Sequence, residues 1–399
     1  MKRESIKYSL NNLKHRRVRS SFTIISILIG IATIFIFVSF GMGLYTYVQE
    51  VSTASSADKI IIQAKGTSVS GLDTTFALTD DDLDAIEKTS GVYGATGSYF
   101  QTAEVVQGKK RIYTLIISYD PKEPLIMDIF GIDIDKGREL IADEDNVVLG
   151  YNYQLPDKIF PNGYDVGEKI EIQGEKVKIV GFYESVGNPQ DDSQIYATND
   201  FMKELYGDNI SYNWIVARVD DSNIDKVVEN VEKSLRKERG LEEGKEDFFV
   251  QSFEDLMETY KNILNMVIGF VILIALISVL VSGVNTANTM ITSVLERKKE
   301  IGIMKSIGSR NSNILSIFLF ESSFLGFVAG VLGVLLGLLV TYVGGVILNN
   351  LGYGFLSPGY SFWLFFGCIA FATLTGAISG VAPAIKASKV NPVDALRYE

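Results

Sequence analysis

The stretch ILNMVIGFVILIALISVLVSGVNTA, residues 263–287, contains no charged residue over 25 positions. A helix needs about 20 consecutive apolar residues to cross the hydrocarbon core of a bilayer. Three more runs meet that length, at residues 20–48, 314–348 and 362–384. The first far exceeds the roughly 7 to 15 apolar residues of a signal peptide, so we expect it to stay as an anchor. The sequence therefore predicts an α-helical membrane protein with four transmembrane helices.

Basic residues sort the short segments between these helices into two groups. Lysine and arginine number 7 in residues 1–19, 5 in residues 288–313 and 3 in residues 385–399, against none in residues 349–361. By the positive-inside rule, the N-terminal segment, the middle connection and the C-terminal tail are cytoplasmic, and residues 349–361 form an outer loop. We expect a multi-pass protein of the cell membrane with one large domain outside.

Residues 49–262, between the first two helices, are predicted to form that outer domain, with a mixed α+β fold. Residues 58–66 (DKIIIQAKG) have the pattern of a strand, and residues 79–88 that of a helix capped by Thr79, with Asp82 three positions later. An amphipathic helix is predicted at residues 225–238. Further strands are predicted at residues 111–118, 146–150, 169–173, 176–182 and 213–219.

The end of the outer domain, residues 252–262, has apolar side chains at helical spacing and runs directly into the second span. Two interpretations are equally compatible with this pattern: a stalk helix that continues into the membrane, or an ordinary helix packed at the domain edge.

Composition excludes most familiar catalytic sites. The chain has one cysteine, Cys368, and one histidine, His15, too few for thiolate zinc sites, histidine metal clusters or Ser-His-Asp catalysis. The net charge of -11 argues against nucleic acid as a partner. No G-x-x-x-x-G-K-[ST] phosphate loop occurs. We predict no catalytic, metal or cofactor site on this chain.

The cytoplasmic connection reads SVLERKKEIGIMKSIGSRNSNIL, residues 293–315. Ile301, Met304 and Ile307 recur at three-residue steps and predict a short amphipathic helix that ends near Gly308. The pattern alone supports two interpretations almost equally. The helix could lie at the membrane interface with its lysines near anionic headgroups, or it could dock into a groove of a partner protein. Lipid recognition as a function has no specific support.

This connection resembles a known family. ERKKEIGIMKSIG matches the pattern E-R-x-x-E-I-G-I-x-x-x-x-G, which joins the second and third helices of MacB/FtsX-like permeases of ABC transporters. The C-terminal APAIKASKVNPVDALRYE resembles the family's closing signature, and residues 11–30 resemble its basic entry to the first helix. Gly137-Arg138, residues 147–150, Val166-Gly167-Glu168 and residues 177–181 resemble its extracytoplasmic core domain. The resemblance covers essentially the whole chain.

The resemblance implies a permease subunit that turns ATP-driven motion into movement of the outer domain, for export or extraction of a substrate. Members of the MacB type carry an ATPase before the first helix, and here about 20 residues precede it. We therefore expect ATP and Mg²⁺ to be bound by a separate ABC ATPase subunit. The expected coupling residues are Glu296, Arg297, Glu300, Ile301, Gly302, Ile303, Met304, Ile307 and Gly308.

The sequence is also compatible with two alternatives to transport. One is a signalling adaptor that activates an extracellular partner such as a hydrolase, and the other is an independent membrane receptor. The resemblance also implies pairing with a second permease, as a homodimer or heterodimer. Membrane lipid and an extracytoplasmic adaptor are further expected partners.

Polar and small residues inside the apolar runs are additional candidates. Glu321, in the third span, is a candidate intramembrane polar site, although we expect it to reach water or Arg310 near the inner interface. Three pairs of glycines at four-residue spacing allow close helix approach, and packing within the chain is the favoured use. They are Gly326 and Gly330, Gly333 and Gly337, and Gly376 and Gly380.

Overall fold

The computed structural model describes residues 17–54, 58–65 and 77–397. The basic N-terminal segment predicted at residues 1–19 therefore lies almost wholly outside the described residues. The chain divides into two compact units. One, the membrane unit, comprises residues up to 44 together with residues 263–347 and 356–399, and the other, the outer unit, comprises residues 45–262 and 348–355.

Four helices in the described chain are long and apolar enough to cross a membrane, in agreement with the predicted fold class. They are α2 (Arg17–Ala54), α7 (Phe253–Glu296), α9 (Asn311–Asn350) and α10 (Phe362–Ser388). At 1.5 Å per residue, the 40 residues of α9 extend over about 60 Å, twice the thickness of a hydrocarbon core. Helix α7 is continuous through residues 253–262 and the second apolar run.

The glycine pairs lie where these helices cross. A side-chain carbon at Gly326 would collide with the carbonyl oxygen of Ala372, and one at Gly376 with that of Ser322. At the same crossing, Gly330 of α9 lies against the side chain of Ala372, and Gly380 of α10 lies against that of Ser322.

Two further glycines of α9 lie against α2. Gly333 leaves room for Ile31, and Gly337 leaves room for Phe35. The glycines thus allow α9 to pack closely on both α10 and α2.

The described residues of the outer unit form two β-sheets, one antiparallel and one mixed. The smaller sheet has the order β11-β1-β10-β2 and is antiparallel throughout. Its strands are β1 (Lys59–Ala64), β2 (Val92–Ser98), β10 (Trp214–Val219) and β11 (Phe248–Ser252). The side chains of Ile60 and Ile62 in β1 and of Ile215 in β10 are fully buried in one core cluster.

The larger sheet has the order β5-β8-β6-β9-β4-β3-β7, and an additional pairing of β8 with β7 closes six of its strands into a ring. Closure removes exposed strand edges. Its strands are β3 (Phe100–Gln107), β4 (Lys110–Tyr119), β5 (Ile134–Gly137), β6 (Asn146–Leu149), β7 (Lys169–Ile172), β8 (Glu175–Tyr183) and β9 (Ile195–Thr198). Two pairings, β4 with β9 and β6 with β8, are parallel.

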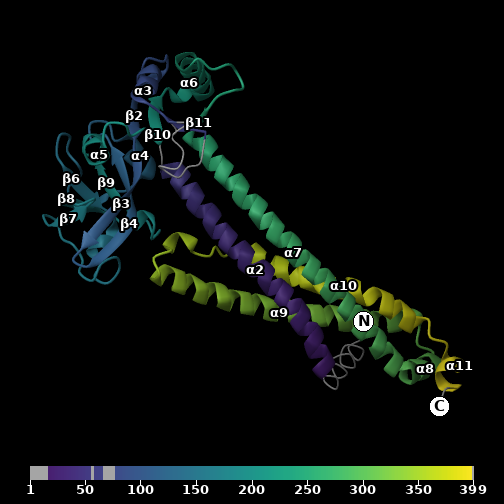
Figure 1. Cartoon of the computed structure of the whole chain (residues 1–399). Helices are drawn as coiled ribbons and strands as arrows, with labels where there is room; N and C mark the ends of the chain where they lie inside the picture. The colour runs from purple at the N-terminus through teal and green to yellow at the C-terminus, as the bar shows by residue number, and fades with distance from the viewer. Residues whose placement is uncertain (1–16, 55–57, 66–76, 398–399) are drawn as a thin grey trace. The chain divides into compact units, whose positions relative to one another are not determined.

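Helices cover the sheets of the outer unit. Helices α3 (Asp80–Glu87) and α6 (Ile224–Arg239) pack together beside the smaller sheet (Figure 1). The predicted cap of α3 is confirmed, because the Asp82 amide donates to Thr79 Oγ1 and the Thr79 amide donates to the Asp82 carboxylate. The outer unit also contains helices α4 (Leu125–Phe130) and α5 (Asn199–Tyr206).

Candidate coupling site between the second and third membrane helices

The connection between α7 and α9 forms a short helix, α8 (Lys298–Ser306). Arg297 separates it from α7 and has non-helical backbone angles, so the chain turns there. Gly308 follows with a φ of 93°, a left-handed conformation that glycine adopts without strain. Beside α8 lies α11 (Pro392–Arg397), which contains part of the C-terminal signature (Figure 1).

The side chain of Ile301 packs α8 against the membrane helices. Its side chain is 0% exposed and belongs to a cluster with residues from α7, α9 and α10. The other buried members are Met290, Val294, Ile314, Phe318, Ala384 and Ala387. Ile301 was expected to contact a partner groove, and the structure instead gives that side chain an internal role, because its apolar surface is already covered by its own chain. Gly302, the next residue, is buried as well.

Arg297 joins the start of α8 to α9. Its Nη1 donates to Glu321 Oε2 and its Nε donates to Glu300 Oε2, both at 3.2 Å. The guanidinium also lies over the ring of Phe318, 5.2 Å from the centroid. Arg297 and Glu321 are both buried, so each charge depends on protein partners instead of water.

This pairing corrects the expectation for Glu321. The sequence predicted contact with water or Arg310, but the carboxylate is 4% exposed and pairs with Arg297. The two residues are 24 positions apart and meet because α7 and α9 lie side by side where α8 begins. Nothing in the local pattern of the connection indicates which basic residue would reach α9.

Lys305 makes a further internal contact that the sequence did not predict. Its Nζ donates to the carbonyl oxygens of Ser388 at 2.8 Å and Val390 at 2.7 Å. The last carbonyls of a helix have no partner within the helix, and a cation there satisfies them. Lys305 therefore caps the end of α10.

The opposite edge of α8 is exposed. Ile303 is 50% exposed, Ile307 is 79% exposed and the Glu300 side chain is 57% exposed. These residues follow one another at three- and four-residue spacing, with Ile307 as the residue directly after α8, and we call them the exposed edge of α8. Glu296 is exposed too, and Met304 is half-buried against the cluster around Ile301. The predicted apolar stripe of Ile301, Met304 and Ile307 is thus divided between the buried face and the exposed edge.

These features define a class of protein: a membrane protein with an α+β domain between its first and second membrane helices and a short anchored helix between its second and third. The MacB-like periplasmic core domain family matches residues 20–234, and the FtsX-like permease C-terminal family matches residues 272–392. The chain belongs to the MacB/FtsX-like family of ABC transporter permeases. It is a membrane protein with an extracytoplasmic domain.

Relatives span the full length of the chain. An uncharacterised ABC transporter permease of Methanocaldococcus jannaschii is 33% identical over 99% of this chain and 98% of its own length. The uncharacterised ABC transporter permease YknZ of Bacillus subtilis is 27% identical over 99% of both chains. The macrolide export ATP-binding/permease protein MacB of Mannheimia succiniciproducens is 25% identical, and this chain spans 61% of its length.

Two solved structures each match about half of the chain. The extracellular domain of YknZ from Gram-positive bacteria matches 49% of this chain and 100% of that domain, with 14% identity and a TM-score of 0.39. The periplasmic region of MacB from Actinobacillus actinomycetemcomitans matches 54% of this chain and 98% of that region, with 16% identity and a TM-score of 0.43.

Proposed function

We propose that this permease transmits ATP-driven motion from a separate ABC ATPase subunit to its extracytoplasmic domain, for export or extraction of a substrate. The observation that carries the proposal is the two-sided construction of α8. One side is fixed by Ile301, Arg297 and Lys305 to α7, α9 and α10, and the other side is an exposed edge.

The exposed edge has the chemistry of a docking surface. Ile303 and Ile307 supply apolar area, and Glu300 supplies a carboxylate beside them. An amphipathic helix of this kind fits a hydrophobic groove on a partner protein. We propose that the ATPase provides this groove, and that ATP and Mg²⁺ bind to the ATPase and not to the permease.

The buried side of α8 contacts the membrane helices, so it would transmit a movement of α8 to them. A displacement of α8 acts on the cluster around Ile301 and on the Arg297–Glu321 ion pair, and therefore on α7 and α9 together. Helix α7 continues without interruption from Glu296 back to Phe253. In this account the second membrane helix works as a lever, and no catalytic group is required on this chain.

Two further elements of the proposal concern assembly and orientation. Apolar side chains of α7 such as Phe270, Ile277 and Leu280 are exposed and suit contact with lipid or with a second permease chain, identical or related. The basic residues of the connection and the tail favour a cytoplasmic location for α8 and α11. An extracytoplasmic adaptor would act on the outer domain.

Co-purification from native membranes tests the proposal. We expect an ABC ATPase to purify with the wild-type chain and to be lost from the double variant Ile303→Asp plus Ile307→Asp, since two charges would enter an apolar contact. The matched control is Ile141→Asp plus Val166→Asp, which changes two exposed apolar residues of the outer unit. Retention of the ATPase by the first variant, or equal loss from both variants, would contradict the proposed docking edge.

A further inference from the structure

The outer unit contains a cavity of about 540 Å³, which the proposed coupling does not require. It lies where strands of both sheets meet the last part of α2 and the first part of α7. Its wall includes Tyr47, Phe100, Asp191, Tyr196, Trp214 and Met257. The volume falls within the range of about 300 to 1,000 Å³ that is typical of small-molecule sites.

Most of the cavity wall is apolar, and aromatic rings form one part of it. The rings of Phe100 and Trp214 lie 5.1 Å apart between centroids, and that of Phe130 lies 6.4 Å from Trp214. All three residues line the cavity. Aromatic walls suit a ligand with flat or bulky apolar groups, and their electron-rich faces attract organic cations.

Among the described residues that line the cavity, Asp191 is the one that carries a charge. Asn188 Nδ2 donates to its Oδ2 at 2.6 Å, and Gln194 Nε2 donates to its Oδ1 at 2.9 Å. Both donors are neutral. Within the part of the chain that the structure describes, neither Asp191 nor the neighbouring buried Asp192 forms an ion pair with lysine or arginine. The carboxylates therefore leave a net negative charge beside an apolar space.

The environment of Asp191 is unfavourable for an isolated negative charge. Burial raises the pKa of the Asp191 carboxyl above its ordinary value, the bond from Asn188 opposes this, and the charge of Asp192 adds to the increase. A bound cation would stabilise the ionised carboxylate. A neutral apolar ligand would leave it uncompensated, and an anion would be repelled.

We propose that this cavity binds a lipophilic organic cation, with its apolar groups against the aromatic wall and its charge toward Asp191. The volume, the aromatic wall and the single carboxylate all point to this class of ligand. The inference goes beyond the proposed function, because it concerns binding by the outer unit and requires no ATPase.

Equilibrium binding of radiolabelled tetraphenylphosphonium to the full chain in lipid nanodiscs tests the proposal, with empty nanodiscs as the reference for partition into lipid. We expect saturable binding at one site per chain. Tetraphenylborate has the same shape and the opposite charge, and we expect it not to compete. Asp191→Asn should weaken binding by about tenfold or more, since one charge contact is lost.

Two further variants separate the site from general effects of mutation. Asp208→Asn removes one exposed carboxylate of the outer unit and should bind like the wild type. Leu256→Trp places a ring into the cavity from α7 while Asp191 and its hydrogen-bond donors stay unchanged, and it should abolish binding.

The proposal is overturned by an absence of saturable binding, by equal competition from tetraphenylborate, or by unchanged affinity in Leu256→Trp. If Asp191→Asn disturbs its loop, as hydrogen exchange would show, Leu256→Trp decides the result. Because no ATPase takes part in this assay, failure here leaves the coupling proposal standing, and failure of coupling leaves this proposal standing.

Discussion

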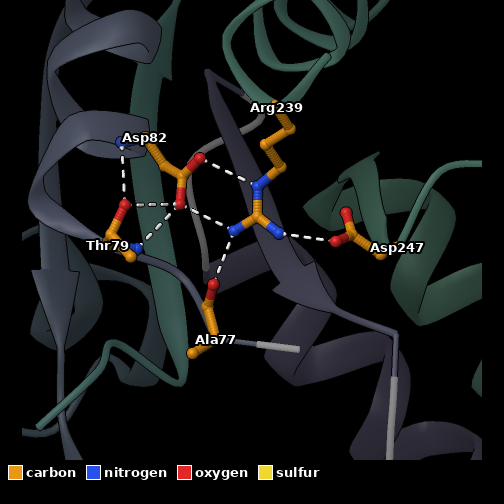
Figure 2. Close-up of polar contacts among 5 residues, drawn as sticks. All are labelled: Ala77, Thr79, Asp82, Arg239 and Asp247. Carbon is orange, nitrogen blue, oxygen red and sulfur yellow. Dashed lines mark hydrogen bonds and ion pairs between the residues drawn. The ribbon is translucent and has the colours of Figure 1, made fainter. Parts of the chain in front are cut away.

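Each of the two units has one arginine that joins several of its own elements, and the two arginines do so in different ways. In the outer unit, Arg239 donates to both oxygens of the Asp82 carboxylate, from Nε at 2.9 Å and from Nη2 at 2.6 Å (Figure 2). It also donates to the Asp247 carboxylate and to the carbonyl oxygen of Ala77. In the membrane unit, Arg297 bonds one buried carboxylate, Glu321, and one exposed carboxylate, Glu300.

The difference lies in what each arginine joins. Arg239 is the last residue of α6 and joins it to the capped start of α3, so its partners all belong to the outer unit (Figure 2). Arg297 stands at the turn between α7 and α8 and ties both to α9. The comparison indicates that Arg239 stabilises a fixed domain, while Arg297 keeps the coupling helix attached to the helices it is proposed to move.

The largest expected effect is on the outer domain. Arg239→Met should destabilise it by about 3–5 kcal/mol, since Asp82 would be left as a buried carboxylate without its cation. Hydrogen exchange of the full chain should show loss of protection in α3 and α6. ATPase co-purification should persist, and its loss would contradict the division of roles between the two arginines.

Breaking the Arg297–Glu321 ion pair should cost less stability than Arg239→Met but should impair function more. Glu321→Leu leaves Arg297 without its buried partner and should cost about 3 kcal/mol of membrane-unit stability. The double variant Arg297→Met plus Glu321→Leu removes both charges and should recover most of that stability. We expect transport-coupled ATP hydrolysis to remain low in both variants. Full recovery of coupling in the double variant would show that the ion pair serves stability alone.

A third change tests the attachment of α8 to α10. Lys305→Met removes the cation that caps two carbonyls, at an expected cost of about 2 kcal/mol for hydrogen bonds to a charged group. Exchange should increase around Ser388, at the end of α10. Lys299→Met, a change of the same type at an exposed position on α8, is the control and should leave that region unchanged.

The smallest expected effect is a pH dependence confined to the outer domain. Burial alone would raise the pKa of Asp82, but hydrogen bonds from Arg239 and Thr79 outweigh it and hold the pKa below the ordinary 3.8. A lowered pKa in the folded state means that the stabilisation is present above the unfolded value and is lost as the pH falls through the folded value. Outer-domain stability should be unaffected by this group down to about pH 4 and should decline below it.

Thermal unfolding followed by tryptophan fluorescence between pH 7 and pH 2.5 measures this dependence. Asp82→Asn should be less stable at neutral pH and should show a weaker decline in acid. An equal acid decline in the variant would mean that other carboxylates control it.

The membrane helices and the cap of α3 could be predicted because their signals are local. An uncharged run of 25 residues has few alternatives to a spanning helix, and Thr79 with Asp82 three positions later forms its cap by itself. Strand β2 was not predicted. Its sequence VYGATGS lacks regular alternation because Gly94 and Gly97 leave room for side chains from elsewhere, including the ring of Tyr212.

The error in the coupling helix has a geometric cause. Steps of three residues in an α-helix rotate by about 300°, so each step drifts by about 60°. Ile301 and Ile307, two steps apart, therefore lie on different faces, and Ile307 joins Ile303 on the exposed edge. The partner of Arg297 could not be predicted either, because Glu321 reaches it only through the packing of α7 against α9.

Cysteine crosslinking tests the central claim, that the exposed edge of α8 contacts an ATPase while its buried face is internal. Cys368 is the single native cysteine, so Cys368→Ala gives a background without thiols. In native membranes, Ile307→Cys should crosslink to an ABC ATPase with a short bifunctional reagent, and Ile301→Cys should not. Crosslinking at Ile301 but not at Ile307, or no ATPase product at either Ile303 or Ile307, would contradict the account.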